Sequence, residues 1–186
     1  MVNAERESGL PCHLRQDVKP EDVQTVRRIV AATGFFTPRE VEVAVELVVE
    51  RLSRGECSGY SFLFAELAGR SIGYACYGPI PCTAASFDLF WIAVEPQYQH
   101  AGLGRRLLAE VESQVRLAAG RRLYIETSNR AQYATTRSFY EKCGYQLEAV
   151  LRDFYAPGDD KVIFVKRLGE VTCPPGTSAA TGSAGT

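Results

Sequence analysis

"FDLFWIAVEPQYQHAGLGRRLL", residues 87–108, is the stretch that decides the fold. Residues 87–94 are apolar on both sides of the strand alternation except at Asp88, which predicts a strand in the centre of a sheet. Pro96 ends the strand, and the apolar spacing that follows predicts a helix over Arg105–Ala118. A short turn with two glycines therefore joins a central strand to a helix.

This turn, residues 99–104 ("QHAGLG"), is of a kind that binds anions. The first N–H groups of the following helix have no partner inside the helix, and they carry the positive end of its dipole. Gly102 and Gly104 place no side chain over these groups, so a phosphate can contact the backbone. The sequence predicts a phosphate or pyrophosphate site here.

Three phosphate-binding patterns compete for the turn. A Walker A loop needs Gly-Lys-Ser/Thr, whereas Arg105 follows the second glycine. A dinucleotide fingerprint needs a small residue where Leu107 stands, and it follows the first strand of a fold. The pattern Gln/Arg-x-x-Gly-x-Gly/Ala matches Gln99–Gly104 in full. A glycine-rich helix cap without a ligand is the structural alternative.

The rest of the chain predicts an α/β domain with one central mixed sheet, helices on both faces and parallel pairing near the middle. Thr37 and Glu40 form a capping box at the start of one helix. Strand alternation sets Trp91 opposite Asp88, in the core. The expected strands are 13–18, 60–67, 71–78, 87–94, 122–127, 145–155 and 160–168, and the expected helices are 19–34, 37–55, 105–118 and 133–144.

Composition limits the classes of partner. The 186 residues carry a net charge of −1, which favours neither nucleic acid nor an anionic membrane surface. Six cysteines and two histidines lack the clustering of a metal site, so no metal is expected. The sequence has no signal peptide or membrane-span pattern, which favours a cytoplasmic protein. We expect one domain over 11–168, with disordered ends at 1–10 and 169–186.

Residues 91–108 followed by "SFYEKCGYQLEAV" (138–150) resemble the GCN5-related N-acetyltransferase (GNAT) superfamily, and the likeness extends over about residues 12–168. The resemblance implies a mostly antiparallel sheet whose splayed parallel strand pair binds acetyl-CoA. It also implies a set of cofactor contacts, with the strand backbone on the pantetheine arm and the turn on the pyrophosphate. These contacts are Ile92, Ala93, Val94, Gln99, His100, Ala101, Gly102, Leu103, Gly104, Arg105 and Tyr140.

The sequence departs from the family at two positions. Gln99 stands where Arg is commoner, which removes a charge but leaves the backbone donors. Tyr133 stands where many members have Asn, so the role of that Asn is not carried over.

The resemblance also implies the catalytic groups. Tyr140 occupies the position of the tyrosine that approaches the CoA sulfur and acts as general acid. Glu126 resembles the strand glutamate of the bacterial acetyltransferases that modify ribosomal-protein N-termini, where it serves as base. Asp88 lies where histone-acetylating members carry their base, and a lone carboxylate in an apolar strand needs a reason. The choice between Glu126, Asp88 and neither stays open.

Three aromatic residues are candidates for the acceptor site. Phe35 and Phe36 fall at the substrate-facing helix connection of the family, and Tyr155 falls in a long turn between the last two strands. Packing in the core, or within the turn itself, is the structural alternative for all three.

The function expected from these observations is transfer of an acetyl group from acetyl-CoA to a primary amine, on a small molecule or a peptide N-terminus. Direct attack in a ternary complex is expected, because Cys143, the thiol closest to the predicted site, has no histidine partner nearby in sequence. Pairing into a homodimer is a further expectation. A non-catalytic CoA-binding module and a nucleotide-phosphate binder are the alternatives.

Overall fold

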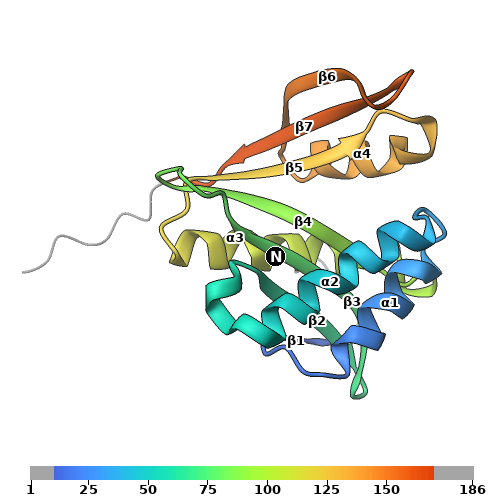
Figure 1. The fold of residues 1–186 in the computed structure, drawn as a ribbon, viewed down its shortest axis with the longest axis vertical. Coiled ribbons are helices and arrows are strands. Elements are labelled where there is room, and N and C mark those ends of the chain that lie inside the picture. The colour runs from blue at the N-terminus through green and yellow to red at the C-terminus, as the bar shows by residue number, and fades with distance from the viewer. Residues whose placement is uncertain (1–10, 170–186) are drawn as a thin grey trace, which may run out of the picture.

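The computed structural model describes residues 11–169 of the chain. These residues form a seven-stranded sheet in the order β1-β2-β3-β4-β5-β7-β6 (Figure 1). The strands are β1 (His13–Arg15), β2 (Ser61–Leu67), β3 (Arg70–Pro79), β4 (Ser86–Val94), β5 (Arg122–Ser128), β6 (Gln146–Ala156) and β7 (Asp159–Arg167). The helices are α1 (Asp22–Ala32), α2 (Pro38–Arg54), α3 (Leu103–Leu117) and α4 (Ala134–Lys142), with 3₁₀ turns η1 (Gly55–Ser58), η2 (Pro96–Tyr98) and η3 (Ala131–Tyr133).

The predicted fold class is confirmed: the sheet is mixed, mostly antiparallel, and carries helices on both faces. The predicted domain bounds of 11–168 stay a prediction. The expectations for residues 1–10 and 170–186 lie outside the described residues.

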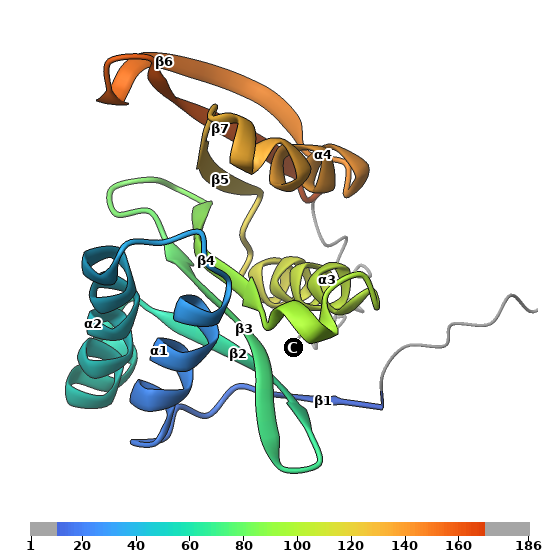
Figure 2. The ribbon, with the colours of Figure 1, turned by 90° about the vertical axis from the view of Figure 1, so that its right-hand side faces the viewer.

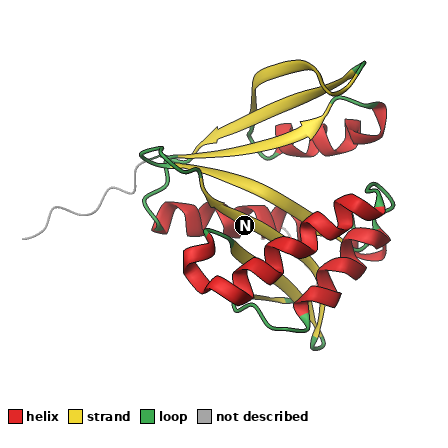
Figure 3. Cartoon of the chain, viewed as in Figure 1, coloured by secondary structure: helices red, strands yellow, loops and turns green. Residues whose placement is uncertain are grey.

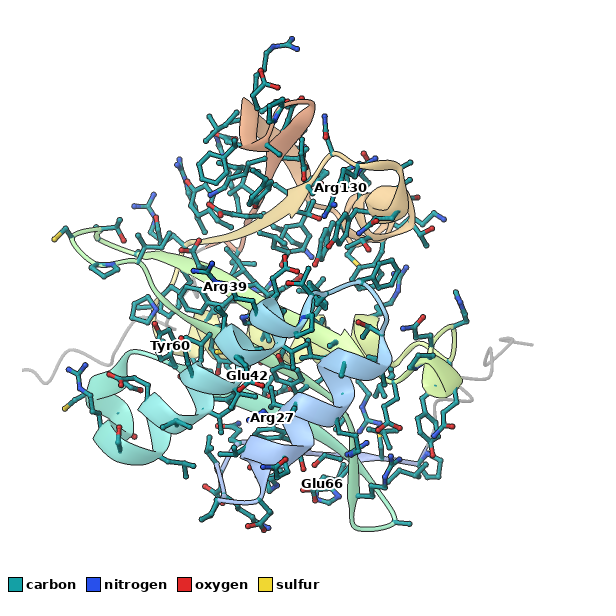
Figure 4. All side chains as sticks on the ribbon, turned by 45° about the vertical axis from the view of Figure 1, so that its right-hand side comes forward. Arg27, Arg39, Glu42, Tyr60, Glu66 and Arg130 are labelled. Carbon is teal, nitrogen blue, oxygen red and sulfur yellow. The ribbon has the colours of Figure 1, made fainter. Side chains whose placement is uncertain are left out.

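Two pairs of helices cover the two faces of the sheet (Figure 2). On the α2 face, α1 and α2 bury a cluster that includes Phe64. On the α3 face, α3 and α4 cover a cluster that includes Leu107 and Phe164. Arg27 of α1 and Glu42 of α2 form an ion pair at 2.7 Å, which ties these two helices together on the outer surface (Figure 4). The sheet is therefore a wall between two separate cores.

The parallel pair β4 and β5 stays together over only part of its length. Ser86–Leu89 of β4 pairs with Arg122–Ile125 of β5. Beyond these residues β4 continues to Val94 alongside β3, and β5 continues to Ser128 alongside β7. The two strands diverge toward their carboxyl ends (Figure 3). The splayed pair that the resemblance implied is present.

Helix starts follow local sequence signals. The Thr37 side chain accepts a hydrogen bond from the Glu40 backbone N–H, and the Glu40 side chain accepts one from the Thr37 N–H, so the predicted capping box is confirmed. The α3 helix begins at Leu103, two residues before the predicted Arg105. Its N-cap is Gly102 in the left-handed conformation, and the helical turn starts within the glycine motif itself.

A β-bulge changes the faces of β4. Cys76 of β3 pairs with Trp91, and the next β3 residue pairs with Leu89, so Phe90 is an extra residue in β4. Leu89 packs in the α3-face cluster, which directs its neighbour Asp88 to the α2 face. Trp91 packs against the α2-face cluster. The prediction that Trp91 and Asp88 face opposite sides is wrong, because the bulge adds one residue between them.

Two further observations concern the expectations from composition. Within residues 11–169 no helix combines the length and the apolar character needed to cross a membrane. Nor do the described His, Cys, Asp and Glu residues contain a group of three or more placed to hold a metal ion.

Candidate active site

The glycine turn leads from the end of β4 into α3. Gly102 has a φ of +79° and His100 a φ of +64°, so two residues of the turn lie in the left-handed region. No side chain caps α3, and the Arg106 N–H makes the first helical bond, to the Gly102 carbonyl at 3.0 Å. A Cβ on Gly104 would meet only the Phe139 ring, at 3.6 Å, which is an ordinary contact. The turn therefore offers backbone N–H groups that no side chain covers.

Polar contacts fix the end of β4 where the turn begins. The Gln99 side-chain amide donates to the Val94 carbonyl at 3.0 Å, so this residue closes the turn onto the strand. Glu95 is buried and accepts two hydrogen bonds from the Arg70 guanidinium, at 2.8 and 2.9 Å. Arg28 of α1 pairs with the same carboxylate. The glycine turn thus starts next to a residue that two arginines hold in place.

The open edge of β4 carries the backbone groups that the resemblance assigned to pantetheine. The Glu95 N–H donates to the Ile72 carbonyl of β3 at 2.9 Å. In an antiparallel pair alternate residues bond to the same partner, so Ala93 also directs its backbone groups to β3. Ile92 and Val94 direct theirs to the side from which β5 has diverged. A ligand strand would find N–H and C=O groups there.

The two candidate carboxylates lie on the same face of neighbouring strands. Asp88 is opposite Tyr124 in the parallel register, and Glu126 follows two residues later on the same face of β5. Asp88 is half-buried; burial first, and then the charge of Glu126, raise its pKa to about 6 against the opposing charge of Lys161. Both carboxylates are therefore next to the point where β4 and β5 separate.

Lys161 of β7 joins this pair. Its Nζ lies 2.6 Å from Oε2 of Glu126, and its side chain is 13% exposed whereas that of Glu126 is 46% exposed. The same Nζ lies 3.8 Å from the centre of the Phe154 ring. Sequence reasoning missed Lys161, because its contact depends on β7 pairing with β5 across more than thirty residues. The alternation of apolar and polar residues along the last strand does not show that this strand pairs with β5.

Aromatic side chains from the α1–α2 connection, β4 and η3 pack in pairs. The rings of Phe35 and Tyr133 lie 5.8 Å apart, and those of Phe36 and Trp91 lie 5.0 Å apart in an edge-to-face arrangement. The Tyr155 ring lies 5.9 Å from the Lys161 Nζ that contacts Glu126, and burial first, and then the Glu126 carboxylate, raise the pKa of its phenol. Tyr133, set aside in the sequence analysis, is part of this aromatic wall.

Tyr140 lies on the α3 face. Its ring packs at 5.4 Å from that of Phe139 and at 6.1 Å from those of Tyr145 and Phe164, and burial raises the pKa of its phenol. The structure brings Asp88, Glu126 and Tyr155 together, and pairs Phe35 and Phe36 with other rings rather than with the carboxylates. It sets Tyr140 on the other side of the sheet. A ligand in the gap between β4 and β5 would have the carboxylates on its α2 side and Tyr140 on its α3 side.

Comparison with known proteins adds the family. Residues 58–147 match the family model of the acetyltransferase (GNAT) domain. A crystal structure from Desulfovibrio desulfuricans, assigned to the GNAT family, is 52% identical; the alignment covers 85% of this chain and 99% of that one, with a TM-score of 0.84. The [ribosomal protein bS18]-alanine N-acetyltransferase of Escherichia coli K12 is 34% identical over 73 residues, which are 39% of this chain and 48% of that protein. The match thus spans about half of the E. coli relative.

A more distant structure shares the fold alone. An aminoglycoside 6'-N-acetyltransferase crystallised with coenzyme A has a TM-score of 0.69 at 18% identity, over 84% of this chain and 97% of that one. The splayed strand pair and the glycine turn, together with these matches, identify the chain as an N-acetyltransferase. The chain belongs to the GNAT acetyltransferase family.

Proposed function

We propose that this protein transfers the acetyl group of acetyl-CoA to a primary amine, carried by a small molecule or a peptide N-terminus. The observation that carries the proposal is the divergence of β4 from β5 beside the uncapped start of α3, with two carboxylates at the mouth of the gap. The relatives named for acetyl transfer to a ribosomal protein and to aminoglycosides support an amine acceptor.

The residues present fit the cosubstrate. The turn from Gln99 to Arg105 would hold the pyrophosphate through backbone N–H groups, because Gly104 leaves them uncovered and α3 has no side-chain cap. The backbone of Ile92 and Val94 would pair with the pantetheine arm along the open edge of β4. Acetyl-CoA supplies an activated thioester, so the protein has to align the amine and move protons.

Asp88 is the proton acceptor in this proposal. A free alkylammonium has a pKa of about 10, and the nitrogen becomes far more acidic as its bond to the acetyl carbon forms. A carboxylate with a pKa of about 6 is ionised at neutral pH and is basic enough to take that proton. The carbon–sulfur bond breaks in the same reaction, and Tyr140, approaching from the α3 face, returns a proton to the thiolate.

The thiol of Cys143 does not suit a covalent route. Burial raises its pKa, which disfavours the nucleophilic thiolate at neutral pH. Direct attack of the amine on the thioester needs no enzyme nucleophile. The proposal is therefore a ternary-complex mechanism.

A thiol-release screen tests the proposed function. Acetyl-CoA is mixed with the protein and with amines, amino acids or peptides, and free CoA thiol is measured. We expect release that depends on one class of amine. Stabilisation by acetyl-CoA without release for any amine would favour the non-catalytic CoA-binding module, and stabilisation by ATP or NAD but not by CoA would favour a nucleotide binder.

Three variants then test the residue roles. We expect Asp88→Asn to lower kcat by about 10²–10⁴-fold, as for loss of a general base, with a smaller loss for Tyr140→Phe. Glu126→Gln should retain measurable turnover, because its carboxylate is engaged by Lys161. Glu56→Gln, on the exposed η1 turn, is the matched control. Unchanged turnover in all three site variants would overturn the assignment.

Two expectations from the sequence stay predictions. We propose that the protein acts in the cytoplasm, which fractionation of cells that express it would check. A homodimer is also proposed, and light scattering coupled to size exclusion would measure its mass.

A further inference from the structure

Lys161 is a mostly buried lysine whose charged end contacts a carboxylate and an aromatic ring. It lies on β7, with its ammonium against Glu126 at 2.6 Å and over the ring of Phe154 at 3.8 Å. The ring of Tyr155 is 5.9 Å from the same nitrogen. The lysine side chain is mostly buried although it carries a charge, and a buried charge is costly unless it is paired. Its contacts therefore constrain both a carboxylate of β5 and the end of β6.

Charged groups from four elements face this point. Glu126 on β5 and Asp88 on β4 are the two acids whose charges interact, and Lys161 acts on both. Glu126 also acts on Tyr155, together with Asp159 of β7, Tyr133 of η3 and Glu40 of α2. Among the ion pairs of residues 11–169, the Lys161 ammonium is the cation in direct contact with Glu126.

We propose that Lys161 is a positioning residue for acetyl transfer: it holds Glu126 as an ion-paired carboxylate on the β7 side and so leaves Asp88 as the group that accepts the proton of the amine. This inference rests on the proposed function. It assigns different tasks to two carboxylates that the sequence could not rank.

The physical reason is the behaviour of neighbouring acids. Two carboxylates at close range share their titration, and neither is a well-defined base, because a proton on one changes the affinity of the other. A cation that contacts only one of them engages that carboxylate in an ion pair. The other remains available, with its affinity for a proton raised by burial and by the neighbouring negative charge. Lys161 makes the contact with Glu126 and not with Asp88.

The test compares two variants that should act in opposite directions. Lys161→Met removes a positive charge that lowers the pKa of Asp88, so the acidic limb of the kcat/KM profile should move to higher pH. Glu126→Gln removes a negative charge that raises this pKa, so the limb should move to lower pH. We expect each shift to be about half to one pH unit.

Controls separate this role from a structural one. Lys161→Arg keeps the charge and should restore the wild-type profile, and Lys142→Met, an exposed lysine of α4, should leave it unchanged. Carboxyl carbon NMR titration of Asp88 in the same variants reads the coupling without turnover and identifies variants that fail to fold. If Lys161→Met fails to fold, Lys161→Gln is used in its place.

The outcomes are distinct. Opposite shifts of the kinetic limb and of the Asp88 titration support the proposal. Turnover in the wild-type protein with unmoved limbs, or limbs that move in the same direction, overturns the role of Lys161 alone. No turnover with any amine overturns the proposed function and this role with it, even where the NMR titration shows the coupling.

Discussion

The ionised form of Asp88 is less favourable in the folded chain than in water, so at neutral pH this residue lowers the stability of the fold. Its pKa is about 6 in the folded chain and 3.8 when fully solvated. Between about pH 4 and 6 the folded state therefore binds more protons than the unfolded state, and the stability contributed by this group is lost as the pH rises through the folded pKa. This sign is opposite to that of an ordinary salt-bridged aspartate.

The Asp88→Asn variant should consequently be more stable than the wild type at pH 8. We expect a gain of about 1–2 kcal/mol in the free energy of unfolding, reduced from the full shift because the side chain is partly solvated. The gain should fade as the pH is lowered to about 4. Urea unfolding at several pH values measures it; a variant that is less stable at pH 8, or equally stable throughout, would contradict the raised pKa.

Gly104 allows a second prediction, because nothing inside the protein forbids a side chain there. Its Cβ would meet Phe139 at 3.6 Å, and alanine favours a helix over glycine. We expect Gly104→Ala to keep or raise the melting temperature and to weaken CoA binding about tenfold or more, measured by calorimetry. Binding of S-acetyl-pantetheine, which lacks the pyrophosphate, should not change. An unaltered CoA affinity would count against the pyrophosphate site.

At the residue scale the sequence located the carboxylates but not their relation. Asp88 was recognisable because a charge in an apolar strand is costly, and Glu126 because it resembles the strand glutamate of the acetyltransferases that modify ribosomal-protein N-termini. Lys161 was not recognisable, because its contact with Glu126 requires the pairing of β5 with β7. A pattern along one strand carries no information about which strand lies beside it.

At the element scale, the start of α2 shapes the acceptor wall. Phe35 and Phe36 immediately precede Thr37, the N-cap residue, and each packs against another aromatic ring, Phe35 against Tyr133 and Phe36 against Trp91. The capping box therefore fixes the direction in which the chain enters the helix. Loss of the cap should therefore change the positions of both the Phe35 and the Phe36 ring.

Thr37→Ala should reveal that link. Loss of the cap should cost about 1 kcal/mol of stability, seen in urea unfolding, and should raise the KM for the amine while leaving the CoA affinity unchanged. Ser53→Ala at the other end of α2, where the hydroxyl bonds only the Glu50 carbonyl, is the matched control. An increase of KM in both variants would mean that general helix stability, not the cap, is responsible.

Elements were the level that sequence reasoning predicted best. Periodicity and caps are local, so the helices and strands of residues 11–169 were expected in the right order. The errors lie where a residue breaks the period. The extra Phe90 in β4 reversed the predicted face of Trp91, and the left-handed Gly102 let α3 begin before the predicted Arg105. Both depend on backbone conformation, which alternation patterns do not report.

At the scale of the whole molecule, the sheet is divided where β4 leaves β5. Four residue pairs, from Ser86 with Arg122 to Leu89 with Ile125, join the two strands before they separate. A CoA thioester bound between them would restore hydrogen bonding across the gap. Cosubstrate binding should therefore stabilise the molecule as a unit.

Hydrogen exchange tests that consequence. On addition of CoA the amides of Ile92 and Val94 should exchange more slowly, whereas that of Ala93, already directed at β3, should change little. At one hundred times Kd the ligand should add about 2.7 kcal/mol to the free energy of unfolding. Equal protection of all three amides would argue against pairing along this edge.

The bulge in β4 also governs how this sequence can change over generations. Deleting Phe90 would remove the extra residue and restore strict alternation, and the other residues of the strand would keep their faces, because Leu89 and Trp91 already lie on opposite sides of the sheet. A codon lost at this position therefore leaves Asp88 and Trp91 on the same face. A codon gained in a strictly alternating part of the strand would instead move the residues beyond it to the opposite face, and so exchange the molecule's inside with its reactive side.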